Sequence, residues 1–240
     1  MEMATHRPCR SAAGVRRFYR RVGGMLALAH RLGTVDCHRE NFIASGEHPL
    51  LVDAEALLHA PASGGDMLPS LLRTGFLPLP NRTAGSEFSA SALSKSSGAH
   101  RPTLNGQPCD ASGYQGELTD GFRLAQSLLT GTIEGRRAFQ RRVAALEKLP
   151  WRRIVRPTAI YAELCERSLQ PAAMRSLNER LRLIRTGCER AGASARIVRA
   201  DIAAITQLDI PYFTGRSKAA KPDLTAEALL AAALRQSFTR

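Results

Sequence analysis

The chain has 240 residues, of which 44% are hydrophobic and 23% are charged. These values lie near the average for globular proteins, so they exclude wholesale disorder and allow one or two domains that fold without metals or disulfides. No apolar stretch reaches the roughly 18 residues of a membrane span, and no secretory signal follows the amino terminus, so we expect a cytoplasmic protein without a membrane span.

The net charge of +13 comes mainly from arginine, since only four of the 34 basic residues are lysines. The basic excess is concentrated in residues 135–199, and such a region attracts ATP, phosphate, acidic peptides or nucleic acid. The sequence shows no helix-turn-helix or zinc-finger pattern, and 5% aromatic content is low for base stacking, so we expect no nucleic-acid partner. The five cysteines form no CxxC pair, which argues against a zinc ribbon or a disulfide scaffold.

The first third of the chain predicts an arm, a helix and a hairpin. Residues 1–17 read as a disordered arm because their first fifteen positions show no apolar periodicity. Apolar residues recur at spacings of three and four from Phe18 to Leu32, which predicts a helix that ends at Gly33. The apolar runs 42–44 and 50–52 flank turn-forming residues and predict a short hairpin.

The middle of the chain is rich in Gly, Ser, Pro and Thr, and we expect a mobile loop over about 86–108. An apolar island over 67–79 interrupts this region and is expected to dock on the core. From residue 117 onward the helical period returns, and it predicts further helices that include 154–169 and 174–190. The expected fold class is therefore mainly α with a small β-hairpin (α+β).

The loop before the predicted hairpin carries the groups that phosphoryl transfer from ATP requires. Asp36, His38 and Asn41 precede the first strand, and Asp53 and Glu55 follow the second. Such a reaction needs a carboxylate near the acceptor hydroxyl, and an amide and a carboxylate that hold Mg²⁺ on the phosphates. One hairpin separates Asn41 from Asp53, which brings the two ends together. The alternative is that these side chains only complete turns or end a strand.

Residues 34–57, TVDCHRENFIASGEHPLLVDAEAL, closely resemble the signature of the dehydratase domain of class II lanthionine synthetases. Four further segments are similar to that domain and occur in the same order: SLLRTGFLP at 70–78, GYQGELTDGF at 113–122, RRIVRPTAIY at 152–161 and DIPYF at 209–213. The resemblance spans about residues 18–215.

The resemblance implies a lipid-kinase-related, mostly helical domain similar to the C-lobe of a kinase. Members of the family phosphorylate Ser and Thr of a ribosomally made precursor peptide with ATP and Mg²⁺. They then eliminate the phosphate to leave dehydroalanine and dehydrobutyrine, and a separate zinc cyclase domain adds cysteine thiols to these alkenes. The expected function is therefore lanthipeptide (lantibiotic) biosynthesis, with the precursor peptide as a partner.

Carried over by position, the resemblance assigns two kinds of role to the loop and the hairpin. Asp36 and His38 would be catalytic, and Asn41 would complete the kinase-like catalytic loop. Asn41 and Asp53 would bind the metal, while Asn41 and Glu55 would contact the nucleotide.

The same resemblance assigns phosphate elimination to Arg152 and Thr158. A fixed guanidinium would stabilise the negative charge that builds on the departing phosphate. The alternative for Arg152 is one more solvated side chain in an arginine-rich segment.

Only 35 residues precede Asp36, and none of them is lysine. Kinases grip ATP with a lysine and a covering loop that precede the catalytic loop. We therefore expect a partial dehydratase domain over 18–215, followed by a tail over 216–240 that begins a truncated segment. A separate N-terminal lobe or a cyclase would then be partners. The alternative is a catalytically inactive remnant, or a split-enzyme subunit, that binds the precursor peptide or a partner lobe.

Overall fold

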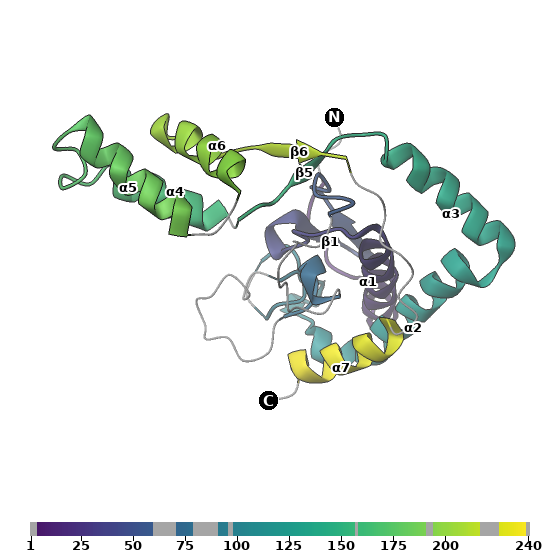
Figure 1. The fold of residues 1–240 in the computed structure, drawn as a ribbon. Helices are drawn as coiled ribbons and strands as arrows, with labels where there is room; N and C mark the ends of the chain where they lie inside the picture. The colour runs from purple at the N-terminus through teal and green to yellow at the C-terminus, as the bar shows by residue number, and fades with distance from the viewer. Residues whose placement is uncertain are drawn as a thin grey trace. The chain divides into compact units, whose positions relative to one another are not determined.

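The computed structural model describes residues 4–59, 71–78, 91–95, 98–156, 158–190, 194–216 and 226–238. The chain divides into two compact units (Figure 1). Unit 1 comprises Met1–Trp151 and Arg216–Arg240, and unit 2 comprises Arg152–Gly215. The described elements are mostly helices, with three small two-stranded sheets, which confirms a mainly α fold with a small hairpin.

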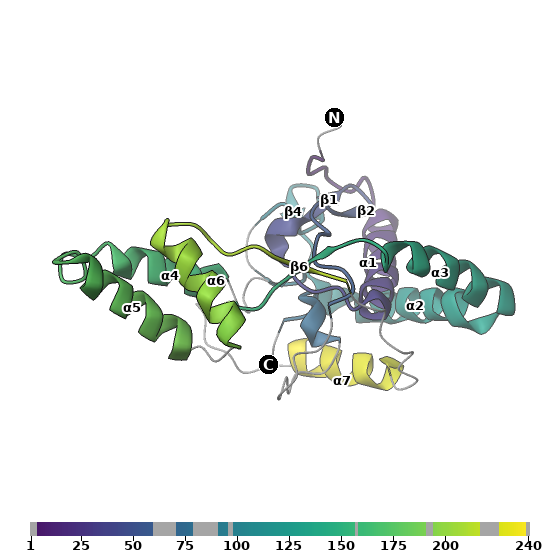
Figure 2. The same ribbon diagram turned by 45° about the horizontal axis from the view of Figure 1, so that its top comes forward.

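Unit 1 is built on two long helices whose backbones nearly touch, α1 (Ala12–Leu32) and α2 (Gln115–Gln126). A Cβ atom added to Gly121 would lie 1.7 Å from the carbonyl oxygen of Arg20, and one added to Gly23 would lie 2.0 Å from that of Leu118. Glycine at both positions therefore permits the close approach. The two views in Figures 1 and 2 show α1 and α2 side by side.

The core of unit 1 is apolar and includes aromatic rings in edge-to-face contact. Phe18 and Phe42 lie edge to face with centroids 6.4 Å apart, and Phe42 and Phe76 do the same at 5.6 Å. The buried residues Leu71 and Leu77 join the same cluster. The described part of the apolar island, 71–78, thus docks on the core as its composition predicts.

Helix α1 begins six residues earlier than predicted. The side chain of Ser11 accepts a hydrogen bond from the Gly14 N–H at 3.1 Å and caps the helix. Before the cap, the N–H of Arg7 donates to Ala44 and that of Cys9 donates to Thr103, at 3.0 and 2.7 Å. The predicted disordered arm over 1–17 is therefore wrong for the described residues 4–17, because these backbone bonds anchor the segment.

The predicted hairpin is present as β1 (Phe42–Ser45) and β2 (His48–Leu51), paired antiparallel. Its register sets Phe42 opposite Leu51 and Ser45 opposite His48. Gly46, with φ of 61°, lies in the turn, where a positive φ favours glycine.

A second hairpin, β3 (Thr103–Leu104) with β4 (Gln107–Pro108), lies where a mobile loop is predicted. Asn105 and Gly106 have φ of 51° and 77°, as a type I′ turn requires, and this dipeptide is a strong hairpin signal. The expectation of a mobile loop is therefore wrong for residues 98–108. Residues 86–90 and 96–97 of that prediction lie outside the described residues.

Two further helices complete unit 1. A π-helical turn, Ser127–Gly131, links α2 to α3 (Ile133–Leu146), which agrees with the helical period seen in the sequence. Helix α7 (Ala226–Phe238) packs against α2 and buries Leu230 and Leu234 in the main core. The tail predicted over 216–240 is thus, in its described part 226–238, a component of the unit 1 core.

Unit 2 contains α4 (Thr158–Ser168), α5 (Leu177–Arg190) and α6 (Ala195–Thr206). Strands β5 (Trp151–Arg153) and β6 (Phe213–Gly215) pair at the two ends of the unit. The predicted helices over 154–169 and 174–190 are present but shorter, and α6 was not predicted. Helices α4, α5 and α6 share a small core: Tyr161, Leu164, Ile184, Cys188 and Ile205. None of the described helices is long and apolar enough to cross a membrane.

Candidate active site

The loop that follows α1 is closed by backbone pairing with the segment that follows β2. Gly33, with φ of 60°, ends the helix in the left-handed conformation. The N–H of Val35 donates to Ala56 at 3.1 Å, and the N–H of Leu58 donates to Leu32 at 3.0 Å. The residues before β1 and after β2 are therefore held at the same place in unit 1.

Asp36 lies in this loop with φ of 68°, a conformation that few residues other than glycine adopt. The side-chain amide of Asn41 donates to the Asp36 carbonyl at 3.1 Å, and the N–H of Cys37 donates to Thr74 at 2.9 Å. Gly75 packs on the same turn, because a Cβ there would lie 3.1 Å from the Cys37 nitrogen. The strained Asp36 backbone is thus fixed by contacts on both sides.

Asp36 and His38 form a side-chain pair. The Nε2 atom of His38 lies 3.3 Å from Asp36 Oδ1, and the two side chains are 30% and 33% exposed. The backbone of His38 pairs with Ser91, and its Nδ1 atom is buried without a hydrogen-bond partner among the described residues. The Asp36 carboxylate therefore lies beside an imidazole and stays partly exposed to solvent.

Asn41 and Asp53 lie at the open end of the first hairpin. The N–H of Val52 donates to the Asn41 carbonyl at 2.9 Å, which extends the β1–β2 pairing by one residue pair. Asp53, the next residue, is exposed, and its Oδ1 accepts the N–H of Glu55 at 3.2 Å. The hairpin thus brings together the two ends that carry Asn41, Asp53 and Glu55.

The side chains at this end that could hold Mg²⁺ are those of Asn41 and Asp53. Because the Asn41 amide nitrogen donates to Asp36, its amide oxygen is the group left for a metal, and Asp53 adds a carboxylate. Among the described residues no cluster of three or more His, Cys, Asp or Glu is placed to hold a metal. Mg²⁺ commonly takes one or two protein oxygens and completes its octahedron with phosphate oxygens and water.

Two arginines of α1 that were not predicted as functional residues bind the turn of the first hairpin. Arg17 donates to Oε2 of Glu47 at 2.8 and 2.5 Å, and Arg21 donates to Oε1 at 2.9 Å and to the Glu47 carbonyl at 2.7 Å. These hydrogen bonds, first from Arg17 and then from Arg21, lower the pKa of Glu47 to about 2. Glu47 therefore ties the hairpin to the helix.

Arg152 and Thr158 lie in unit 2 and line one small pocket, together with Tyr161 and Phe213. The guanidinium of Arg152 stacks over the ring of Tyr212, 5.5 Å from its centroid. Thr158 is exposed at the first residue of α4. These two predicted residues therefore line the same small pocket.

The same sequence segment contains a buried ion pair that sequence reasoning missed. Arg156 bonds to Asp201 of α6 and donates to the Cys188 carbonyl at 3.0 Å, and the Tyr161 hydroxyl donates to Asp201 at 3.1 Å. Asp201 is fully buried. Within the RRIVRPTAIY segment, Arg156 and Tyr161 are thus buried, Arg152 is partly exposed and Thr158 is exposed, and all four line the small pocket. The sequence signal for a buried charge here is Asp201, an aspartate on an otherwise apolar face of α6.

Comparison with known proteins places the chain in a family. A family model described as a domain of unknown function (DUF4135) matches residues 1–100 and 92–216, and the chain belongs to this family. The chain is also 22% identical over 256 residues to the lacticin 481/lactococcin biosynthesis protein LcnDR2 of Lactococcus lactis subsp. lactis. That alignment covers 89% of this chain and 27% of the relative, so the chain spans about a quarter of that protein's length.

Proposed function

We propose that this chain acts in lanthipeptide biosynthesis as part of a dehydratase with a kinase C-lobe-like fold. The enzyme would phosphorylate Ser and Thr of a precursor peptide with ATP and then eliminate the phosphate. Similarity to a lacticin 481/lactococcin biosynthesis protein supports the pathway. The observation that carries the chemistry is the backbone pairing of Asn41 with Val52, because it sets an amide and a carboxylate beside the Asp36 loop.

In the phosphorylation step, ATP with Mg²⁺ supplies the phosphoryl group. Asn41 and Asp53 would hold the metal through their side-chain oxygens, and Glu55 would contact the nucleotide. Asp36 accepts the proton of the substrate hydroxyl, as the catalytic aspartate of kinases does. His38, 3.3 Å from Asp36, keeps that carboxylate in one orientation.

In the elimination step, the α-carbon of the phosphorylated residue loses its proton to water, and the electrons of that C–H bond form the Cα=Cβ double bond. The Cβ–O bond breaks, so phosphate departs with its bonding electrons. Arg152 stabilises the charge that develops on the leaving group. The Thr158 hydroxyl donates a hydrogen bond to the same phosphate. Stacking on Tyr212 holds the Arg152 guanidinium in place.

The precursor peptide is the proposed substrate, and a nucleotide-gripping lobe and a cyclase are proposed partners in the cytoplasm. The assay pairs this chain with the polypeptides encoded beside it.

Intact-mass spectrometry of a co-expressed Ser/Thr-containing precursor tests the proposal. We expect the loss of one water per modified residue with the wild-type chain. Asp36→Asn should abolish this loss, whereas Asp120→Asn, an exposed aspartate of α2, should leave it unchanged. Unmodified peptide that co-purifies with the wild-type chain would instead favour a binding subunit. Unmodified peptide without co-purification would contradict both functions.

A further inference from the structure

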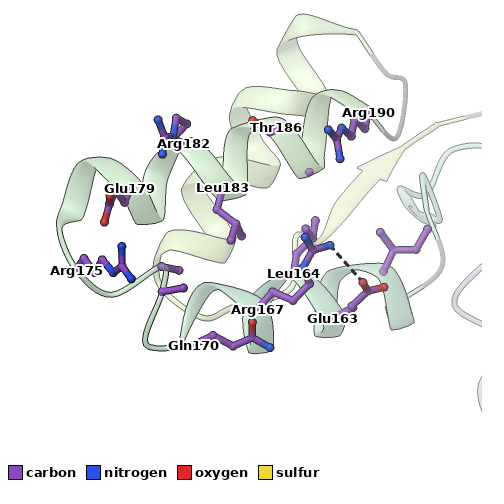
Figure 3. Close-up of a pocket in the computed structure, with 14 residues that line it drawn as sticks. Glu163, Leu164, Arg167, Gln170, Arg175, Glu179, Arg182, Leu183, Thr186 and Arg190 are labelled. Atoms are coloured by element: carbon purple, nitrogen blue, oxygen red, sulfur yellow. Dashed lines mark hydrogen bonds and ion pairs between the residues drawn. The ribbon is translucent and has the colours of Figure 1, made fainter.

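A groove runs between α4 and α5 of unit 2, with a volume of about 730 Å³. The two helices meet where Gly187 faces Leu164, since a Cβ on Gly187 would lie 2.3 Å from the Leu164 side chain. Leu164 and Leu183 face each other across the groove (Figure 3). The floor is therefore apolar.

Charged side chains surround this floor. The groove is lined by four arginines and two glutamates: Arg167, Arg175, Arg182, Arg190, Glu163 and Glu179. Arg167 and Glu163 form an ion pair at 3.4 Å, drawn as a dashed line in Figure 3. Arg175, Arg182 and Arg190 are exposed and have no carboxylate partner among the residues that the structure describes. The rim thus offers unpaired positive charge beside an apolar surface.

One acidic side chain of the lining is partly buried. The Oε2 atom of Glu179 is closed off from solvent and has no hydrogen-bond donor in the described part of the chain. The exposed charge of the rim is therefore mainly that of the arginines.

We propose that this groove binds an acidic peptide segment. Its carboxylates would pair with Arg182 and Arg190, which lie eight residues apart on α5, about 12 Å along the helix axis. That distance matches about four residues of extended chain. An apolar side chain between the carboxylates would cover Leu164 and Leu183.

The lining disfavours nucleic acid as the occupant. No aromatic side chain lines the described groove, so bases have no stacking platform. None of the residues proposed for catalysis lines the groove, so peptide binding here does not require phosphoryl transfer.

Fluorescence anisotropy of the full 240-residue chain tests the proposal, with a short fluorescein-labelled peptide that carries glutamates on either side of two leucines. We expect saturable binding that weakens at least about tenfold in the double variant Arg182→Glu/Arg190→Glu, because charge-assisted contacts are lost. The control Arg185→Glu/Arg199→Glu makes the same charge change at exposed positions outside the groove and should change affinity less than about twofold.

A third variant separates groove binding from general charge attraction. Leu183→Gln keeps every charge and should still weaken peptide binding several-fold, also at high salt, where surface attraction is screened. Equal losses in the two double variants, or no effect of Leu183→Gln, would overturn the proposal. Tighter binding of a labelled RNA oligonucleotide, sensitive to Arg182→Glu/Arg190→Glu, would also overturn it. Circular dichroism of each variant checks that unit 2 stays folded.

Discussion

Unit 1 is stabilised by a large apolar core in which two helix backbones nearly touch, whereas unit 2 surrounds a small core with a buried ion pair. In unit 1 the critical contacts are those of Gly23 and Gly121, where no side chain fits. In unit 2 they are the bonds of Arg156 and Asp201, which link the start of α4 to α6. The stability of unit 1 should therefore respond to added volume, and that of unit 2 to a lost charge.

The largest effect on stability is expected from Asp201→Ala in unit 2. Removing one partner of a buried pair leaves the Arg156 charge uncompensated, at a cost of about 3–5 kcal/mol. Hydrogen exchange followed by mass spectrometry should show faster exchange over residues 158–206, with unit 1 unchanged.

Two further variants sharpen this result. The double change Arg156→Met/Asp201→Leu should recover most of the stability, since apolar residues can replace a buried pair. Arg167→Met breaks only the exposed pair with Glu163 and should cost about 0–1 kcal/mol. Equal costs for Asp201→Ala and Arg167→Met would show that the buried pair does not hold unit 2 together.

A smaller effect is expected from Gly121→Ala in unit 1. The added methyl group would collide with the Arg20 carbonyl and force α1 and α2 apart, at a cost of roughly 1–3 kcal/mol. The matched control is Gly116→Ala in the same helix, where nothing lies within 4 Å of the added Cβ. This change should raise the free energy of unfolding by up to about 1 kcal/mol, because alanine has a higher helix propensity than glycine. Chemical denaturation of the two variants measures both effects. Equal stability of Gly121→Ala and Gly116→Ala would contradict the close packing of α1 against α2.

The smallest effect concerns the pH dependence of the hairpin attachment. The folded pKa of Glu47 is about 2, against an ordinary value of 4.5, so its pairing with Arg17 and Arg21 stabilises the fold above pH 4.5. This contribution is lost as the pH falls through about 2. The melting temperature of Glu47→Gln should therefore lie below that of the wild type at neutral pH and approach it near pH 2.

An exposed acid provides the control for that measurement. Glu134, in the first turn of α3, has no arginine partner among the described residues, so Glu134→Gln should show no comparable convergence at low pH. A constant difference between Glu47→Gln and the wild type across the pH range would argue against the ionic attachment.

Local patterns predict local structure well in this chain. The hairpin, α1 and the docking of residues 71–78 follow from apolar periodicity and turn composition. The start of α1 at Ala12 and the second hairpin also had local signals, the Ser11 cap and the Asn105–Gly106 turn.

Contacts between distant parts of the sequence could not be predicted in the same way. Arg156 and Asp201 are 45 residues apart, and although the apolar helix face around Asp201 indicates a buried aspartate, it does not identify Arg156 as the partner. The positive φ of Asp36 depends on Thr74 and Gly75, which approach only in the folded unit. The proximity of the two chain segments that carry Asn41 and Asp53 could be predicted from the sequence, because a single hairpin joins them.

The two units also differ in the chemistry proposed for them. Asp53 in unit 1 is proposed to bind the metal for phosphorylation of the peptide, and Arg152 in unit 2 is proposed to assist elimination of the phosphate. Asp53→Ala removes a metal ligand, so the precursor peptide should stay unmodified. Arg152→Ala removes charge stabilisation of the leaving group, which typically costs roughly 10²–10³ in rate, and leaves phosphorylation intact.

Intact-mass analysis of the precursor peptide, co-expressed with each variant in the active assembly, tests this division most directly. The account predicts unmodified peptide with Asp53→Ala, phosphorylated peptide with Arg152→Ala, and normal dehydration with Arg199→Ala, an exposed arginine of α6. Unmodified peptide or normal dehydration with Arg152→Ala would contradict it.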